Sequence, residues 1–308
     1  MLSVSVIVTS SHEPQTIGWA LKAILEQNSP QIKEILVVAP DEGTLSAAKE
    51  STTENAKVKF LKDSGKGKPA ALNLALRQAQ GDILVLTDGD VYVAPKALSH
   101  LLRPFSDIQV GGSCGRPIPT NRRDTMFGFW SHFLTEAAHQ IRLDRSRKGQ
   151  FLELSGYLLA IRKSIISPVR LASPAEQGVA GEAIPPNTLA DDLYLSHLIA
   201  KSGFKTVYTP DAKVLVNYPT NLSDWFKQKK RSAFEYWQNN YSSGQKMRTP
   251  SGEVFYGLKF AVTYPKNFQE IFWLKLLFWA RTFLWLQIFF LKLTHSQKNL
   301  WVQVKSTK

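Results

Sequence analysis

The sequence has 308 residues, of which 44% are hydrophobic and 20% are charged. This composition is typical of a globular protein with one large domain or two, and it excludes a wholly disordered chain. The single cysteine, Cys114, excludes a disulfide scaffold and a zinc site built from several cysteines. The first residues lack the basic and long apolar regions of a signal peptide, so we expect a reducing, cytosolic setting.

The net charge of +13 is unevenly distributed along the chain. Residues 213–308 contain 15 Lys and Arg against 4 Asp and Glu, together with six of the eight tryptophans. A basic segment interleaved with Trp and Phe suits an anionic membrane surface. It also suits a nucleic acid, whose phosphates would meet Lys and whose bases would stack on aromatic rings.

Apolar runs alternate with helical patterns over the first 90 residues. The sequence predicts strands at 2–8, 34–38, 57–61 and 82–87, and helices at 16–27, 45–50 and 69–80. This alternation is typical of βαβ units around a mostly parallel sheet, so the predicted fold class is α/β. Polar residues follow three of the strands, at Thr9–Glu13, Ala39–Gly43 and Asp88–Asp90. Parallel sheets bind ligands at the carboxyl ends of their strands, so we expect a site at this edge.

The rest of the chain is less regular up to Tyr218 and then becomes basic and aromatic. We expect helices at 127–142, 189–202 and 222–241, strands at 153–162, 204–208 and 213–216, a loop at 173–188 and a linker at 242–252. Residues 271–293 are dominated by Leu, Phe, Ile and Trp and are numerous enough to span a bilayer.

Charged residues within and beside this apolar stretch argue against a clean membrane span. On a helical projection, Glu270, Lys275, Arg281 and Lys292 fall in one arc of roughly 140°. Charges near the bilayer centre are costly. We therefore expect a helix that lies in the membrane interface or packs on a partner.

The strongest local signal for chemistry is Asp88-Gly89-Asp90, directly after an apolar strand. Two carboxylates separated by one glycine can hold a hard divalent cation beside a phosphate, because Mg²⁺ and Mn²⁺ prefer oxygen ligands. The alternative is a plain hairpin turn, since Asp-Gly is turn-prone.

A second carboxylate pair, Asp191-Asp192, stands at the start of a predicted helix. Either residue could stabilise the helix N-terminus as a cap or through the dipole. The functional alternative is a general base for a substrate hydroxyl.

Two further segments are weak signals by themselves. Gly65-Lys66-Gly67-Lys68 precedes a predicted helix and offers amides and a lysine to a diphosphate. Gln228 and Arg231 are three apart and so share one face of a predicted helix. Taken alone, the first segment is better explained as a solvated basic turn and the second as a solvated basic helix.

Taken in order, these segments resemble the family-2 glycosyltransferases, which have the GT-A fold, over residues 3–240. The matching segments are Ser5–Val8 with Glu13, Glu34–Val38 with Asp41–Thr44, Gly67–Asn73, Asp88–Asp90, Ser155-Gly156, Asp191-Asp192 with Leu195, and Gln228–Arg231. Ser232 replaces the tryptophan that follows the last motif in processive polysaccharide synthases, which argues against processive synthesis.

The resemblance implies an inverting transfer of a sugar from a nucleotide-diphosphate sugar, with a UDP-sugar expected, to a lipid-linked or glycan hydroxyl in cell-envelope synthesis. It implies that Asp192, next to Asp191, is the catalytic base, and that Mg²⁺ or Mn²⁺ is held by Asp90 and Asp88. It places Ser155 and Gly156 on the acceptor side. The donor contacts implied are Thr9, Ser11, Glu13, Asp41, Lys68, Asp88, Gln228 and Arg231.

The expected organisation is a GT-A catalytic domain over residues 1–220 and a helical C-terminal region over 221–308. Within the former, 1–110 form the nucleotide-sugar half and 111–220 the acceptor half. We expect the C-terminal region to hold the enzyme, peripherally or as an anchor, at the cytoplasmic side of an anionic membrane, with no nucleic acid partner.

Three alternatives remain at this stage. A sugar-phosphate nucleotidylyltransferase would want a glycine-rich loop after the first strand, where this chain has Thr9–Glu13. A nucleic-acid-binding protein would leave the acidic strand ends unexplained. A catalytically dead scaffold would not need the carboxylates that the chain retains.

Overall fold

The computed structural model describes residues 2–27, 29–52, 55–166, 182–186, 188–238, 257–293 and 305–307. The chain divides into two compact units. Unit 1 comprises Met1–Pro117 and Lys148–Val216, and unit 2 comprises Ile118–Arg147 and Asn217–Lys308.

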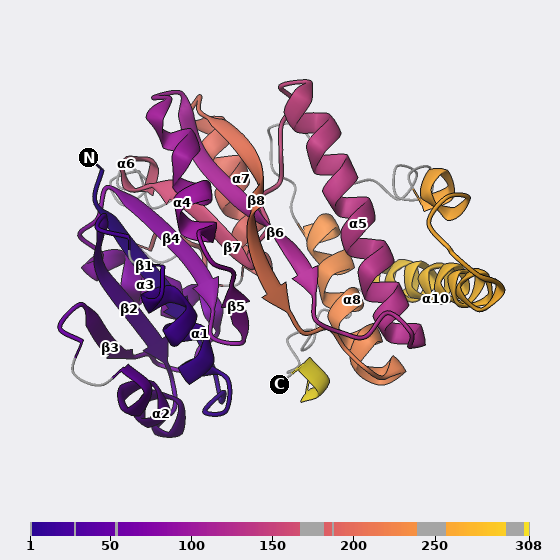
Figure 1. The fold of residues 1–308 in the computed structure, drawn as a ribbon, viewed down its shortest axis with the longest axis horizontal. Coiled ribbons are helices and arrows are strands. Elements are labelled where there is room, and N and C mark those ends of the chain that lie inside the picture. The colour runs from indigo at the N-terminus through magenta and orange to yellow at the C-terminus, as the bar shows by residue number, and fades with distance from the viewer. Residues whose placement is uncertain are drawn as a thin grey trace. The chain divides into compact units, whose positions relative to one another are not determined.

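Unit 1 is built on an eight-stranded sheet with the order β3-β2-β1-β4-β7-β6-β8-β5 (Figure 1). The strands are β1 Val4–Thr9, β2 Ile32–Ala39, β3 Val58–Lys62, β4 Ile83–Asp88, β5 Val91–Val93, β6 Val110–Pro119, β7 Leu158–Arg162 and β8 Lys205–Val216. β1 pairs with β2 and β4 in parallel, and β2 pairs with β3 in parallel. The pairs β4–β7, β6–β7 and β5–β8 are antiparallel. The expected α/β class with a mostly parallel N-terminal sheet is therefore confirmed.

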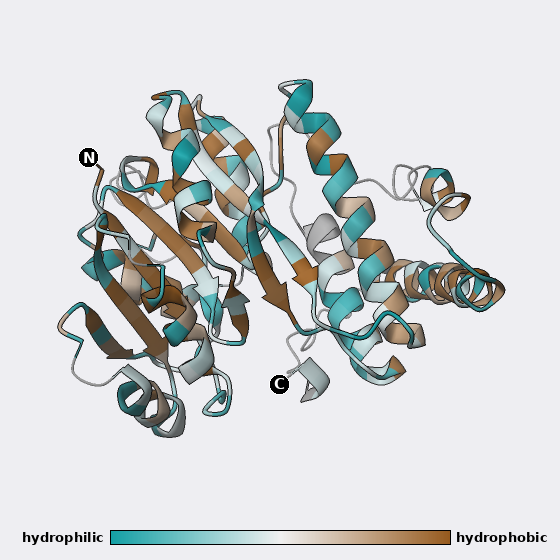
Figure 2. Ribbon diagram, in the orientation of Figure 1, coloured by the Kyte–Doolittle hydropathy of each residue, from teal (hydrophilic) through white to brown (hydrophobic). Residues whose placement is uncertain are grey.

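The centre of the sheet forms the core of unit 1. All six residues of β1 are buried, as are the first five of β4. Strands covered on both faces read as continuous apolar runs, which is why these segments stand out in the sequence (Figure 2). β3 is only partly buried, as expected of a strand at the edge of the sheet.

Helices connect these strands and pack beside them. They are α1 Ile17–Leu25, α2 Glu42–Thr52, α3 Lys68–Gln78, α4 Ala97–Leu102, α6 Lys163–Ile166 and α7 Asp191–Lys201, with a short 3₁₀ turn, η1, at Arg103–Ser106. Gly67 precedes α3 with φ 98°, a left-handed conformation that glycine adopts at no steric cost, and Pro69 stands in the first turn. The N-terminal order of strands and helices is therefore the predicted one.

Two strand predictions were wrong in extent. Only Leu158–Arg162 of the expected strand 153–162 is a strand, because the amides of Leu154 and Gly156 donate to the side chains of Ser196 and Asp192 instead of to a neighbouring strand. The two short strands expected at 204–208 and 213–216 are one strand, β8. Proline has no N–H to donate to a neighbouring strand. Pro210 is tolerated on the β5 side because β5 pairs only with the last three residues of β8.

Unit 2 is helical in the residues described. Its main helices are α5 Met126–Arg147, α8 Leu222–Gln238 and α10 Phe268–Leu293, and η3 Lys305–Thr307 is a 3₁₀ turn. An aromatic core joins all three helices through Phe129, Trp130 and Phe133 of α5, Trp225 of α8, and Leu274 and Leu277 of α10. A second cluster joins Ala233 of α8 to Leu284 and Ile288 of α10. The expected loop 173–188 lies mostly outside the described residues, and the linker 242–252 lies wholly outside them.

α10 differs from the expectation in how its charges are placed. Glu270 is 6% exposed and binds Arg123, whereas Lys275 is exposed. The predicted charged arc is therefore divided between the packed and the open sides of the helix. The open side is instead apolar, with Phe268 91% exposed and Trp279 75% exposed.

Candidate active site

The candidate site of unit 1 begins where β1 and β4 end. Thr9 pairs with Asp88 in the parallel register, and the Thr9 hydroxyl donates to Asp88 Oδ1 at 3.3 Å. The chain leaves β1 toward β2 on one side and returns at β4 on the other, so this is the point where the strand order reverses. Such switch points are where open α/β sheets bind ligands. The structure thus places Thr9 and Asp88 at the predicted edge.

The turn at Asp88-Gly89-Asp90 is not a hairpin. β4, before it, pairs with β1 and β7, and β5, after it, pairs with β8. A Cβ on Gly89 would lie 2.5 Å from Ser10 Oγ and 2.9 Å from Ile17 Cδ1, so the turn is pressed against the β1 loop. Only glycine fits between the two aspartates without moving that loop.

The loop after β1 is tied to the start of α2 by hydrogen bonds. Asp41 accepts the amide of His12 at 2.8 Å and the amide of Thr44 at 2.9 Å. Burial alone would raise the pKa of Asp41, but these amides outweigh it and hold that pKa below its ordinary value. Ser10 donates to Glu13 Oε2 at 2.6 Å, and the Glu13 amide donates to Thr44 Oγ1 at 2.8 Å. Asp41 and Glu13 therefore shape this loop, and their contacts with a nucleotide-sugar donor stay a prediction.

Lys68, the first residue of α3, joins two of the predicted carboxylates. Its Nζ lies 2.7 Å from Asp88 Oδ1 and 3.6 Å from Asp191 Oδ2. Burial would lower the pKa of Lys68, but the charges of Asp191 and Asp88 raise it well above its ordinary value. The ammonium therefore stays charged, and it links the end of β4 to the start of α7.

Asp191 and Asp192 occupy the first turn of α7. The preceding residue, Ala190, offers no side-chain cap. Burial raises the pKa of Asp191, and the neighbouring Asp192 and Asp88 add to this while Lys68 opposes it. Asp88 and Asp191 thus share the ammonium of Lys68 at the base of this site.

Asp192 faces a different partner from Asp191. Its Oδ2 accepts the amide of Gly156 at 2.9 Å, and its Oδ1 accepts the amide of Leu193 at 2.9 Å. A Cβ on Gly156 would lie 3.0 Å from Asp192 Oδ2, so glycine allows this close approach. Tyr157 is tied to β4, because its carbonyl accepts the Thr87 hydroxyl at 2.8 Å. The predicted Gly156 therefore joins the predicted base, and Ser155 beside it is buried.

The remaining predicted residues lie apart from this cluster or outside unit 1. Ser11 is partly exposed, with its hydroxyl 3.1 Å from His12 Nδ1. Gln228 and Arg231 belong to α8 in unit 2, where Gln228 Oε1 is buried without a hydrogen-bond partner among the described residues. Their donor contacts stay a prediction.

Asn73 of α3 has no role predicted from the sequence beyond its place in a matched segment. It is 2% exposed, and its side-chain amide binds the backbone of Ile184. A polar residue among the apolar positions of the predicted helix could have indicated a structural role for Asn73. Its hydrogen-bond partner, Ile184, could not be predicted from the sequence.

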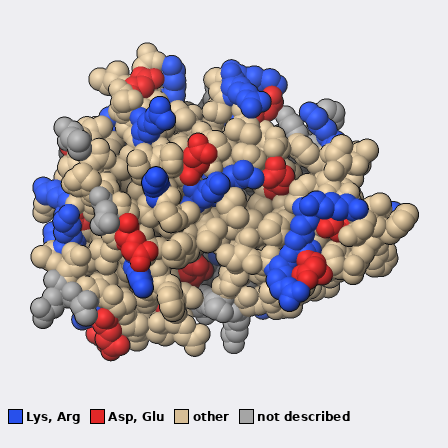
Figure 3. All heavy atoms as spheres, viewed as in Figure 1, with Lys and Arg blue, Asp and Glu red and all other residues tan. Residues whose placement is uncertain are grey.

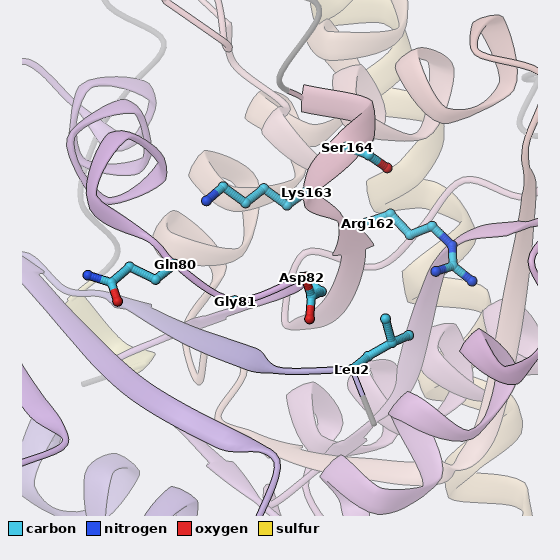
Figure 4. A pocket seen from close by; sticks show the side chains of 7 residues that line it. All are labelled: Leu2, Gln80, Gly81, Asp82, Arg162, Lys163 and Ser164. Carbon is cyan, nitrogen blue, oxygen red and sulfur yellow. The ribbon is translucent and has the colours of Figure 1, made fainter.

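The opposite edge of the sheet has a hollow of about 340 Å³ that is unsuited to chemistry (Figure 4). Asp82 there accepts the amide and hydroxyl of Ser3, both at 2.8 Å. Arg162 donates to the carbonyls of Val110, Phe105 and Asp107, and Lys163 donates to that of Ala79. The charged groups of the hollow, Asp82, Arg162 and Lys163, are therefore already engaged in holding the fold.

The carboxyl edge fits a divalent cation that a diphosphate helps to hold. Among the described residues no three His, Cys, Asp or Glu side chains form a metal site by themselves. Asp88 and Asp90 are partly exposed at the strand end and offer the oxygen ligands that Mg²⁺ and Mn²⁺ prefer. Mg²⁺ is commonly bound by one or two carboxylates plus substrate phosphates. Asp88 and Asp90 therefore fit such a cation only if the phosphates of a bound substrate supply further oxygen ligands.

Comparison with known proteins defines the class to which this fold and site belong. Residues 3–235 match the family described as Glycosyltransferase like family 2, so the chain belongs to this family. The chain is 26% identical over 259 residues to an N-acetylglucosaminyltransferase of Mesorhizobium japonicum, covering 80% of this chain and 58% of that protein. It is 26% identical over 254 residues to a hyaluronan synthase of Streptococcus pyogenes, covering 79% and 59%. The chain spans little more than half the length of these relatives.

Solved structures with low sequence identity share the fold. The mannosyltransferase PcManGT from Pyrobaculum calidifontis, in complex with GDP-Man and Mn²⁺, is 22% identical with a TM-score of 0.57, covering 89% of this chain and 73% of that one. GalNAc-T7 with UDP, GalNAc and Mn²⁺ is 14% identical with a TM-score of 0.52, covering 84% and 55%. The expected GT-A fold is therefore confirmed.

Proposed function

We propose that this chain is an inverting glycosyltransferase that moves a sugar from a nucleotide-diphosphate sugar to an acceptor hydroxyl. The observation that carries the proposal is the single ammonium of Lys68, 2.7 Å from Asp88 and 3.6 Å from Asp191. It links the donor-side strand end to the helix whose second residue, Asp192, is the proposed base. The name of the N-acetylglucosaminyltransferase relative supports N-acetylglucosamine as the first sugar to test. The UDP in the GalNAc-T7 structure supports UDP as its nucleotide.

In this proposal Asp192 is the general base. Gly156 and Leu193 each donate one amide to its carboxylate, which fixes its direction and leaves lone pairs on both oxygens for a substrate proton. As the acceptor oxygen bonds to the anomeric carbon, its proton passes to Asp192, and the bond from that carbon to the diphosphate breaks with its electron pair. One displacement of this kind inverts the anomeric centre and needs no enzyme nucleophile.

The leaving diphosphate requires positive charge at the carboxyl edge. A Mg²⁺ or Mn²⁺ held by Asp90 and Asp88 would neutralise charge that develops on the diphosphate. Lys68 adds a fixed positive charge beside Asp88, since its raised pKa keeps it protonated. Thr9 holds Asp88 from the β1 side.

The test is release of nucleoside diphosphate from a panel of UDP- and GDP-sugars with Mn²⁺, in the presence of lipid-linked and soluble glycan acceptors. We expect turnover with at least one donor that needs both the acceptor and the metal and stops on chelation. Turnover that persists in excess EDTA would refute the metal assignment, and failure of every donor would refute the proposed reaction.

We further propose that the open face of α10 docks on an anionic membrane, which would bring a lipid-linked acceptor to the enzyme. Residues Phe268–Leu291 are long and apolar enough to cross a membrane by length and composition. One side of the helix packs on α5 and α8 through Leu277, Leu284 and Ile288. The large apolar residues that are exposed are Phe268, Ile271, Phe272, Trp279, Phe283, Leu286, Phe289 and Phe290. An exposed apolar face of this extent marks an interaction site.

The packing of α10 favours a position along the membrane surface over a span. A crossing helix would carry α5 and α8, with their many charged residues, into the hydrocarbon region, where charges are costly. Vesicle flotation tests this placement. The wild type should float with anionic vesicles at low salt, and a Trp279→Asp, Phe283→Asp variant should not. The proposal fails if both proteins float alike.

No nucleic acid partner is proposed. Among the described residues on the face shown in Figure 3, Lys and Arg lie beside Asp and Glu, without a continuous basic stripe. A nucleic acid backbone calls for such a stripe.

A further inference from the structure

Asn73 makes a paired hydrogen bond with a backbone segment far away in the chain. Its Nδ2 donates to the carbonyl of Ile184 at 2.7 Å, and the amide of Ile184 donates to Asn73 Oδ1 at 3.0 Å. The two residues are 111 positions apart. Asn73 is 2% exposed and Ile184 is fully buried. The side chain thus takes the place of a neighbouring strand for one residue.

An asparagine in this position needs a reason. Asparagine is a poorer helix former than alanine, and a buried amide is costly unless all its groups are bonded. Here one donor and one acceptor of the side chain are used on one backbone residue. Asn73 therefore does more than fill space: its two hydrogen bonds hold the backbone of the segment 182–186 at Ile184.

The clamped segment leads directly to the proposed base. Ile184 precedes Asp191 by seven residues and Asp192 by eight. α7 has no side-chain cap of its own, so its start is held by contacts with other elements. Those contacts are Lys68 with Asp191 at 3.6 Å and Gly156 with Asp192 at 2.9 Å. α3 therefore contacts both ends of the stretch from Ile184 to Asp191, through Asn73 and through Lys68.

We propose that Asn73 is a positioning residue for catalysis, which holds the segment that delivers Asp192 to the acceptor side of the site. This inference rests on the proposed function. The two residues of α3 then have different tasks. Lys68 contacts both Asp88 on the donor side and Asp191 on the acceptor side, whereas Asn73 bonds only the segment on the acceptor side. Loss of Asn73 should accordingly impair the chemical step and leave nucleotide binding intact.

The experiment uses Asn73→Ala, Asn73→Leu and a matched control, Ser5→Ala. Leucine keeps the branched shape of the side chain in a larger volume and removes both hydrogen bonds. The Ser5 hydroxyl is fully buried near the opposite edge of the sheet, where it accepts the amides of Gly81 and Gln80 and donates to Glu34 Oε1. Ser5→Ala therefore removes buried hydrogen bonds away from the site. Each variant is measured for thermal stability, kcat, donor KM and Mn²⁺-dependent UDP binding.

We expect kcat to fall about 10- to 100-fold in both Asn73 variants, because a displaced base loses alignment with the acceptor. Donor KM and UDP binding should stay within about threefold of wild type. Ser5→Ala should lose thermal stability and keep its kcat. If the Asn73 variants lose stability as Ser5→Ala does and keep kcat, the residue is only structural and the proposal is overturned. An equal loss of UDP binding would overturn it as well.

Amide hydrogen exchange provides a readout that does not depend on turnover. The amides of Ile184 and Leu193 donate to Asn73 and Asp192 respectively. In Asn73→Ala we expect faster exchange at both, while Ser5→Ala leaves both unchanged. Unchanged exchange at Leu193 in Asn73→Ala would overturn the positioning role. If the wild type transfers no sugar, the proposed function fails while this measurement still decides whether Asn73 positions Asp192.

Discussion

At the residue scale, the absence of a side chain at Gly89 shapes the carboxyl edge of the sheet. The glycine lets the Asp88–Asp90 turn lie against Ser10 and Ile17, where an added Cβ would approach to 2.5 Å. The two carboxylates thereby stand at the end of β4 without displacing the β1 loop. The loop and the carboxylates are a single packed unit, so a change in one disturbs the other.

Gly89→Ala tests this packing. We expect a loss of about 1–3 kcal/mol in the free energy of unfolding from overpacking, together with weaker Mn²⁺-dependent UDP binding. Gly43→Ala in the first turn of α2 is the matched control, since its Cβ would meet Asp41 Oδ1 at an ordinary 3.6 Å. Chemical denaturation and calorimetric titration check both. If Gly89→Ala is as well tolerated as Gly43→Ala, the close packing is not significant.

The ionised carboxylate of Asp191 is expected to lower the free energy of unfolding at neutral pH. Its raised pKa means that the folded protein holds the proton more tightly than the unfolded chain, so ionisation at pH 7 opposes folding. Asp191→Asn should therefore match or exceed the melting temperature of the wild type at pH 7. This advantage should shrink as the pH falls and the wild-type Asp191 gains its proton. A variant clearly less stable than the wild type at pH 7 would contradict the raised pKa.

The sequence could predict many of these residues because topology alone gathers them. Thr9 and Asp88 end strands that are neighbours in any right-handed βαβ arrangement with this order. The contacts of Lys68 with Asp191 and of Asn73 with Ile184 could not be predicted. They depend on where a segment more than 110 residues further along the chain returns, and no local pattern encodes that.

At the element scale, the start of α10 is fixed by one arginine. Arg123 donates to Glu270 through Nε at 2.9 Å and through Nη2 at 3.0 Å, and to the carbonyl of Tyr264 at 3.1 Å. Its guanidinium also lies 4.4 Å from the centre of the Tyr264 ring. The bonds from Arg123 hold the pKa of Glu270 below its ordinary value.

Arg123→Ala should be strongly destabilising, because it leaves the carboxylate of Glu270 buried without its cation. We expect a loss of about 3–5 kcal/mol in the free energy of unfolding of unit 2. Arg123→Lys should recover only part of this loss, since lysine cannot donate through a planar fork or stack on Tyr264. The exposed pair Arg122–Asp124 supplies the control, and Arg122→Ala should change stability little. Denaturation followed by Trp fluorescence distinguishes these cases.

The start of α8 should be sensitive to acid. Asp224 accepts the Nζ of Lys227 at 2.9 Å and the amide of Ser306 at 3.0 Å. The hydrogen bond from Lys227 and those from Ser306 hold the pKa of Asp224 well below its ordinary value. A carboxyl with a depressed pKa stabilises the fold above its unfolded pKa of about 4, and this stabilisation is lost as the pH falls below that value.

Asp224→Asn should accordingly lower the free energy of unfolding by about 2 kcal/mol at pH 7, the scale of a hydrogen bond to a charged group. The difference from wild type should diminish as the pH falls below about 4, where the wild-type carboxyl also gains its proton. Urea denaturation across this pH range provides the measurement. A difference independent of pH would show that the charge of Asp224 is not what matters.

Periodicity predicted the elements well where local sequence decides and poorly where tertiary contacts do. α1, α3 and β4 agree with their predicted ranges to within about two residues. Residues 153–157 have a strand-like pattern but bond to α7, and Pro210 interrupts the pattern of β8 without breaking the strand. Both errors arise from partners that are distant in sequence.

At the scale of the whole molecule, the division of the chain by charge and hydropathy agrees only partly with its division into two structural units. The near-neutral first 212 residues supply most of unit 1, whereas the basic and aromatic tail supplies α8 and α10 of unit 2. α5 also belongs to unit 2, and nothing in its composition indicated that it packs with the C-terminal helices. The division into a catalytic region up to residue 220 and a C-terminal region stays a prediction.

The roles proposed for Asp90 and Asp192 are separated by comparing UDP binding with sugar transfer in Asp90→Asn and Asp192→Asn. Asp192→Asn should bind UDP with Mn²⁺ within about threefold of wild type and lose about 1,000-fold in kcat, the scale of a missing general base. Asp90→Asn should lose the part of UDP binding that depends on Mn²⁺. A folded Asp192→Asn enzyme that turns over near the wild-type rate would contradict the account.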